Sequence, residues 1–94
     1  MRTLALFIVL AGCATVSPPG AELAAARTAV IQAEPAARRY APDELRLAQE
    51  KLARAEQAMA REQWGEARRF AEQAEVDARL AFAIAENERA RSAQ

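Results

Sequence analysis

Histidine is absent from the 94-residue sequence and cysteine occurs once, so the side chains that enzymes and metal sites use most are missing. Zinc sites need cysteine or histidine ligands, and histidine is the commonest general acid or base. Hydroxyl side chains such as Ser17, Thr28 and Ser92 have no candidate base beside them. Glu72 and Glu75 share one predicted helix face, but amphipathic helices routinely produce such pairs. We therefore expect no catalytic residues, no metal site and no cofactor, and predict that the protein is not an enzyme.

An excess of charge of either sign is also lacking. The 13 Lys and Arg residues balance the 13 Asp and Glu residues. Nucleic-acid binding depends on clustered basic charge, so we expect no nucleic-acid partner. A single cysteine cannot form a disulfide bond within the chain, and we expect the folded domain to be stabilised by packing alone.

The longest apolar run lies at the N-terminus, where residues 4–10 follow a short start that carries Arg2. A helix of these seven residues would rise only about 10 Å, whereas about 20 residues are needed to cross the hydrocarbon core of a membrane. This layout is typical of an export signal. We interpret residues 1–12 as a signal peptide that is removed.

The end of this run, Leu10, Ala11, Gly12 and Cys13, resembles the lipobox of bacterial lipoproteins. Lipid transfer needs a strong nucleophile, and a thiolate is the strongest among ordinary side chains. The resemblance implies that Cys13 becomes the first residue of the mature protein and carries acyl chains, of which two or more give stable anchoring. Ala14, where some lipoproteins have Asp, implies the periplasmic face of the outer membrane, or the cell membrane in a Gram-positive cell.

Residues 13–20 are interpreted as the lipidated cysteine and a flexible tether. The stretch that follows Cys13 reads "ATVSPPG" and has no helical or strand period. Seven residues reach at most roughly 25 Å when extended. The folded domain is therefore expected to stay close to the membrane surface.

The remaining residues, 21–94, are predicted to form one small helical domain. Alanine occupies 24 of the 82 positions after the signal peptide, interleaved with charges of both signs. Apolar residues recur at steps of three and four, which predicts helices at about 21–39, 42–63 and 66–91. The predicted faces are Leu23, Ala26, Val30, Ala33, Ala37 and Tyr40 in the first helix, Leu45, Ala48, Leu52, Ala55 and Met59 in the second, and Ala67, Phe70, Ala71, Ala74, Ala78, Ala81 and Ala85 in the third.

Proline and glycine suggest the helix boundaries. Pro42 suits the first position of the second helix, and Gly65 suits the left-handed residue at a helix end, with Trp64 folding over the junction. Pro35 predicts a kink or an early stop near Ala33. Because short turns force neighbouring helices to run antiparallel, the predicted fold class is all-α: an antiparallel helical hairpin with an additional N-terminal helix, similar to a three-helix bundle.

The third predicted helix has apolar residues outside its alanine face, at Val76, Leu80, Phe82 and Ala83. Either the first helix covers this second face, or another subunit does. Self-association or a protein partner is therefore expected.

Charged residues of opposite sign stand four apart, which is typical of a solvated helix face. An alternative reading makes Arg68 and Arg69 a grip for an anionic ligand, but Glu66 and Glu72 largely cancel their field. The four pairs are Glu34 with Arg38, Glu50 with Arg54, Arg68 with Glu72, and Glu75 with Arg79.

The stretch from residue 40 to residue 81 resembles the bacterial lipoprotein family known as domain of unknown function 4398. Some relatives carry an added peptidoglycan-binding domain, which implies a cell-envelope role, and the family brings no known activity. The residues that carry the resemblance are Tyr40, Ala41, Pro42, Glu44, Leu45, Lys51, Leu52, Ala67, Arg68, Arg69, Ala71, Glu72, Gln73, Ala74, Asp77 and Ala78. The hairpin is also similar to one tetratricopeptide unit, with small residues at Ala55, Ala67 and Ala74, and at least three such units are needed for a solenoid.

We expect a lipid-anchored cell-envelope protein that acts as a helical structural or protein-interaction module at the periplasmic face of the outer membrane. Its expected partners are the membrane, through the anchor, and a protein or a second copy, with no small-molecule substrate. Two alternatives stay open. One is a small membrane-active or stress-responsive lipoprotein, and the other is an accessory subunit or chaperone of an envelope enzyme.

The anchoring hypothesis predicts the behaviour of Cys13→Ala. Both lipid transfer and cleavage depend on the sulfur, so this variant should accumulate as an unprocessed precursor without acyl chains. Mass spectrometry of the purified protein measures this directly. A lipid-modified mass in the variant would contradict the hypothesis.

Overall fold

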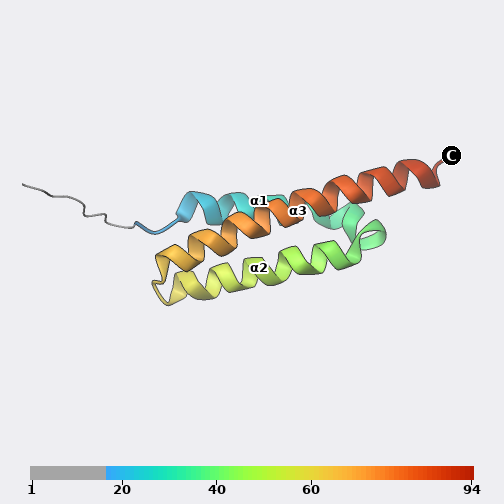
Figure 1. Ribbon diagram of the computed structural model, residues 1–94. Coiled ribbons are helices and arrows are strands. Elements are labelled where there is room, and N and C mark those ends of the chain that lie inside the picture. The colour runs from blue at the N-terminus through green and yellow to red at the C-terminus, as the bar shows by residue number, and fades with distance from the viewer. Residues whose placement is uncertain (1–16) are drawn as a thin grey trace, which may run out of the picture.

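A computed structural model describes residues 17–94, which form three α-helices and contain no strand. The helices are α1 (Gly20–Tyr40), α2 (Pro42–Ala60) and α3 (Trp64–Ser92) (Figure 1). All three contact one another. The predicted all-α, bundle-like fold is therefore confirmed.

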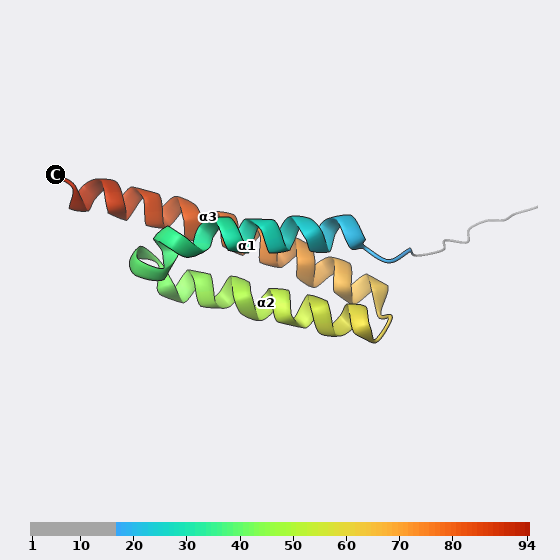
Figure 2. The same ribbon diagram turned by 180° about the vertical axis from the view of Figure 1, so that it is seen from behind.

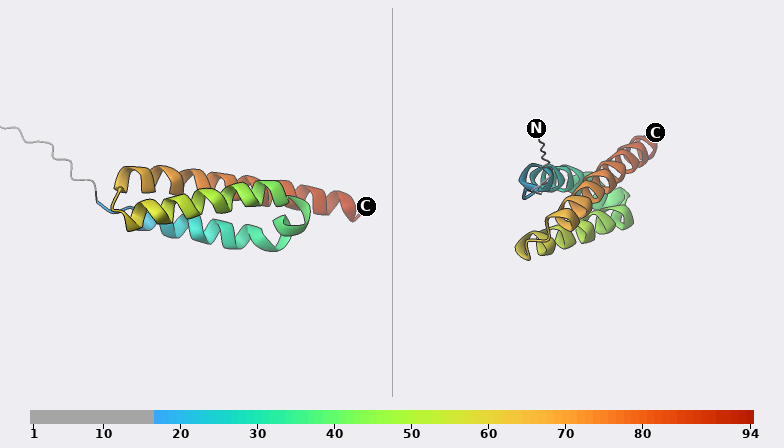
Figure 3. Two further views of the ribbon diagram at one scale, coloured as in Figure 1. Left: turned by 90° about the horizontal axis from the view of Figure 1, so that it is seen from below. Right: turned by 60° about the vertical axis from the view of Figure 1, so that its left-hand side comes forward.

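The helix α3 is the centre of the arrangement. Both α1 and α2 pack extensively against α3 and much less against each other, and they lie along one side of it (Figure 3). Successive helices run antiparallel, so the start of α1 lies at the same end of the bundle as the α2–α3 turn (Figure 1). With 29 residues, α3 is the longest helix, and its C-terminal end extends beyond the other two (Figure 2).

Pro35 lies inside α1, and the early stop predicted near Ala33 is wrong, because the helix continues to Tyr40. Ala33 and Ala37 are completely buried on either side of the proline, and this packing holds both halves of the helix in place. Pro35 itself is exposed. The carbonyl that it leaves without an intrahelical partner belongs to Ile31, which is also exposed, so water can bond to it.

A single buried residue, Ala41, separates α1 from α2. Its N–H donates to the Ala37 carbonyl at 2.9 Å, and its own carbonyl accepts from the Leu45 N–H at 3.0 Å. Pro42 takes the first position of α2, as predicted, where the missing N–H costs no helical hydrogen bond. Ala41 therefore bonds to the last turn of α1 through its N–H and to the first turn of α2 through its carbonyl.

The turn between α2 and α3 differs from the prediction. Gly65 does not adopt the left-handed conformation and lies inside α3; the residue with positive φ is Glu62, at 60°. The Gln63 N–H donates to Ala58 O at 2.9 Å and the Glu62 N–H to Met59 O at 3.1 Å. This is a Schellman motif, which satisfies the last carbonyls of a helix. It ends α2 at Ala60, three residues earlier than expected.

The core consists mainly of alanine, and the predicted faces are largely confirmed. Three clusters of buried residues follow one another along the bundle. The sequence pattern missed Ala29 and Ala58, which are buried, while the large side chains Leu52, Met59 and Phe70 are only half-buried. In α3 the buried residues are Ala67, Ala71, Ala74, Ala78, Ala81 and Ala85.

Each pair of helices is joined by an ion pair that the sequence pattern did not predict. These are Arg27 with Glu56 at 3.0 Å between α1 and α2, Lys51 with Asp77 at 3.2 Å between α2 and α3, and Arg68 with Glu22 between α3 and α1. Two of the four predicted pairs form, Glu34 with Arg38 at 3.7 Å and Glu75 with Arg79 at 2.5 Å. Arg68 is engaged by α1 and does not pair with Glu72, and Glu50 forms no ion pair with Arg54 within residues 17–94.

The alanine core predicts different effects for two Ala→Leu substitutions. Ala74 is completely buried among residues of all three helices, so Ala74→Leu should force the helices apart and destabilise the fold by about 1 to 3 kcal/mol. Ala60→Leu, at an exposed position, should be nearly neutral. Thermal melts followed by circular dichroism measure both, and equal effects would contradict the packing described.

Candidate functional site

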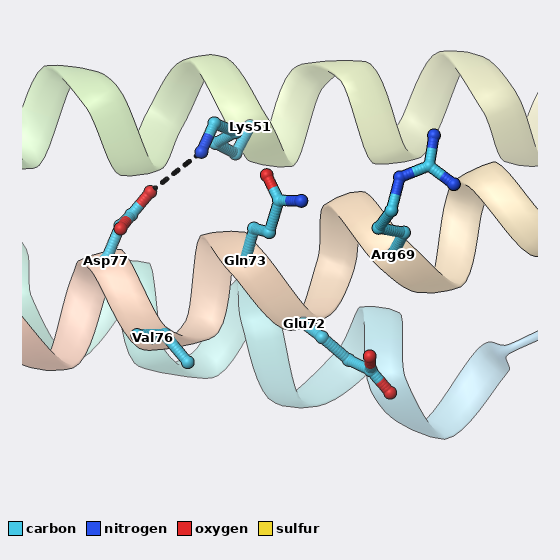
Figure 4. Close-up of a pocket in the computed structure, with 6 residues that line it drawn as sticks. All are labelled: Lys51, Arg69, Glu72, Gln73, Val76 and Asp77. Carbon is cyan, nitrogen blue, oxygen red and sulfur yellow. Dashed lines mark hydrogen bonds and ion pairs between the residues drawn. The ribbon is translucent and has the colours of Figure 1, made fainter.

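A shallow groove between α2 and α3 combines charges of both signs (Figure 4). Its lining residues are Lys51 from α2 and Arg69, Glu72, Gln73, Val76 and Asp77 from α3. Lys51 reaches across the groove to Asp77, while Glu72 and Val76 point away from α2 (Figure 4). The groove is therefore bridged by an ion pair between its two helices, and its lining carries charges of both signs rather than of one.

The two arginines of the predicted anion grip point to different partners. Arg68 pairs with Glu22 of α1. Arg69 lies 3.8 Å from Glu66 and stacks over the Phe70 ring at 5.5 Å. Each guanidinium already has a carboxylate partner, so the structure does not combine them into one anion site.

Phe70 connects α2 to α3 near the turn. The guanidinium of Arg54 lies 5.8 Å from the ring centroid, in addition to Arg69. Cation–π contacts at exposed positions contribute about 0.5 to 1 kcal/mol each. A hollow beside the ring is lined by Arg54, Gln57, Ala58, Arg61, Gln63, Glu66 and Phe70. We assign this cluster a role in fixing the hairpin.

The outer side of α3 carries an uncovered apolar face. Val76 is 64% exposed and Leu80 is 52% exposed, and Ala83 is also exposed. These residues lie opposite the buried alanines because α1 and α2 both pack on the other side of the helix. Of the two covers that the sequence left open, the first helix is excluded for this face.

Phe82 belongs to a different surface, between α1 and α3. It is 43% exposed and borders a small hollow with Ala29, Gln32 and Arg79. The four predicted outer residues therefore do not form one patch. Val76, Leu80 and Ala83 share the outer side of α3, and Phe82 turns toward α1.

The described residues provide no metal-binding cluster. Within residues 17–94, no group of three or more His, Cys, Asp or Glu side chains is placed to hold an ion. A hydrogen bond to Glu86 raises the pKa of Arg89, which is charged at any physiological pH in either case. Cys13 and the rest of the predicted lipobox, Leu10 to Gly12, lie outside the described residues.

None of the three helices in the described range is long and apolar enough to cross a membrane.

The Lys51–Asp77 ion pair should contribute more to stability than the other ion pairs on the surface. Its side chains are 26% and 20% exposed, against 64% and 82% for Arg46 and Asp43. Asp77→Ala leaves a half-buried ammonium without its partner and should destabilise the domain by about 1 kcal/mol, whereas Asp43→Ala should change stability by a few tenths. Chemical denaturation of the two variants distinguishes them, and equal midpoints would contradict this ranking.

A comparison with known families identifies the chain. The sequence profile of a family described as Domain of unknown function (DUF4398) matches residues 21–94, which include all of α2 and α3 and nearly all of α1. No curated protein and no solved structure shows a significant match. The resemblance seen between residues 40 and 81 thus extends through the first helix. The chain belongs to the DUF4398 family.

Proposed function

We propose that the protein is a lipid-anchored cell-envelope protein that acts as a helical structural or protein-interaction module at the periplasmic face of the outer membrane. The observation that carries the interaction role is the uncovered apolar face of α3, with Val76 and Leu80 more than half exposed. A small domain with few large apolar residues in its core leaves such residues outside at a cost in solubility. A partner that covers them removes this cost.

The tether that follows Cys13 would join the bundle at one end. α1 begins at Gly20, seven residues after Cys13, and this end of the bundle also contains the α2–α3 turn and Trp64 (Figure 1). With acyl chains on Cys13, the tether would hold this end of the bundle close to the lipid. The outer side of α3 remains accessible along the length of the bundle.

The membrane-active alternative has less support from the packing. It requires the helices to separate and expose their apolar faces to lipid. Those faces are alanine-rich and tightly buried against one another, and alanine gains little from insertion because it has a small apolar area. An accessory subunit or chaperone is a special case of the interaction role, in which the partner is an envelope protein.

Photo-crosslinking in intact cells tests the proposal. A photoreactive amino acid at Leu80 of the full-length protein should give discrete protein adducts in the outer-membrane fraction. Leu47 is the matched control, since it is a leucine on α2 with 44% exposure, and it should give several-fold less adduct. The anchoring part is tested separately by metabolic labelling of Cys13 with a fatty acid.

Two results would contradict the proposal. Equal and diffuse labelling at Leu80 and Leu47 would remove the case for an interaction face on α3. Leakage of a dye from vesicles of outer-membrane lipid, caused by the purified protein at micromolar concentration, would favour the membrane-active alternative.

A further inference from the structure

The uncovered side of α3 carries a regular pattern that continues beyond Val76 and Leu80. Its residues recur at alternating steps of three and four, which is the spacing of a heptad seam. All except Gln73 are exposed on the side of the helix opposite the six buried alanines, whereas Gln73 is half-buried and lines the groove beside α2 (Figure 4). The seam consists of Gln73, Val76, Leu80, Ala83, Asn87 and Ala90. In heptad terms α3 thus has two seams, of which the bundle uses one.

We propose that the outer seam of α3 binds a second copy of this chain, with the two α3 helices packed antiparallel. This inference rests on the interaction role proposed above and names the partner. It commits to one register, in which the symmetry axis passes between Ala81 and Phe82.

Side-chain sizes are complementary in this register. Leu80 of each copy lies opposite Ala83 of the other copy, so a large residue meets a small one twice at the centre, which is how facing layers interdigitate. Val76 lies opposite Asn87, and Gln73 lies opposite Ala90. By symmetry each of these two layers occurs twice, and all four lie outside the central Leu80–Ala83 layers, toward the ends of the seam, where water can reach the amide groups.

The charges beside the seam are complementary in the same register. Arg79 and Glu86 flank the seam on one edge, and the antiparallel arrangement places Arg79 beside Glu86 of the second copy, twice by symmetry. Both side chains are accessible, at 74% and 36% exposure. Their present partners, Glu75 and Arg89, belong to α3 itself, so the contact breaks no bond between helices.

The parallel arrangement is less favourable. It would place Glu72 of each copy beside Asp77 of the other, so that two carboxylates meet twice; Glu86 would meet Arg91 of the other copy, but both Arg79–Glu86 contacts would be lost. It would also place Leu80 opposite Leu80 and Ala83 opposite Ala83, which stacks large on large and small on small. One self-complementary pattern of size and charge under a single twofold axis favours a second copy over an unrelated partner.

The antiparallel dimer is compatible with anchoring of both copies. The symmetry axis lies about 17 residues from Trp64, or about 26 Å at 1.5 Å per residue, so the two anchored ends stand roughly 50 Å apart. Both tethers reach one membrane only when the long axis of the dimer lies along its surface. The dimer therefore places the bundles side-on to the lipid.

Charge reversal tests the register in the full-length protein, with two differently tagged copies made in one cell and co-purified in mild detergent. Arg79→Glu and Glu86→Arg should each weaken self-association about tenfold, because each turns two attractive contacts into repulsive ones. Arg79→Glu mixed with Glu86→Arg should associate as well as the wild type, since both pairs then regain opposite charges. Arg38→Glu is the matched control: Arg38 also pairs with a glutamate four residues away but lies on α1, and its reversal should have no effect.

Cysteine pairing tests the direction. Leu80→Cys in one copy and Ala83→Cys in the other should form a disulfide on mild oxidation, whereas Leu80→Cys alone should give little dimer. Predominant disulfides from Leu80→Cys alone, or failure of the two charge-reversed variants to restore each other, would overturn the proposal. Circular dichroism of each variant confirms that the fold is retained.

The outcomes also separate this inference from the broader one. Adducts at Leu80 with a different protein, together with no co-purification of the tagged copies, would overturn the dimer and leave the interaction role intact. Absence of both adducts and co-purification would overturn both.

Discussion

The close approach of three helices through alanine is the constraint on which the rest of this structure depends. Six alanines on α3 are completely or almost completely buried, and their methyl groups let α1 and α2 lie close to one helix at the same time. Close backbones gain many dispersion contacts, but each alanine removes little apolar area from water. Every buried position of α3 is an alanine, and the large apolar residues Val76 and Leu80 lie on the outer side of the helix.

Alanine faces have little relief, so they do not fix by themselves how far one helix slides along another. The ion pairs between helices supply this information, since every pair of helices has one and Arg68 reaches Glu22 across 46 positions of sequence. Individually such pairs add little to stability in solvent. Together with the cation–π contacts at Phe70, they favour the observed alignment of the three helices.

The two faces of α3 have separate roles in the proposed function. One face builds the domain, and the other is available for the association that we propose. Charges are distributed accordingly: Arg79 and Glu86 are bonded only within α3, whereas Arg68 and Asp77 join α3 to its neighbours. In the proposed dimer, the mixed charge along the outer side gives pairing a preferred direction.

The sequence by itself determined the all-α class, the three helices and most of the buried positions, because the 3.6-residue period of apolar side chains survives even when the residue is mostly alanine. The family was also predictable from residues 40–81, and the profile match extends the assignment over α1. Tertiary structure decided the rest. Because α1 packs on α3, the helix continues past Pro35. Backbone hydrogen bonds place the left-handed residue at Glu62 rather than at Gly65. Charged residues 26 to 46 positions apart in sequence pair across helices. These outcomes depend on contacts between segments distant in sequence, as does the exposure of the outer side of α3, which follows from α1 and α2 packing on the same side of that helix.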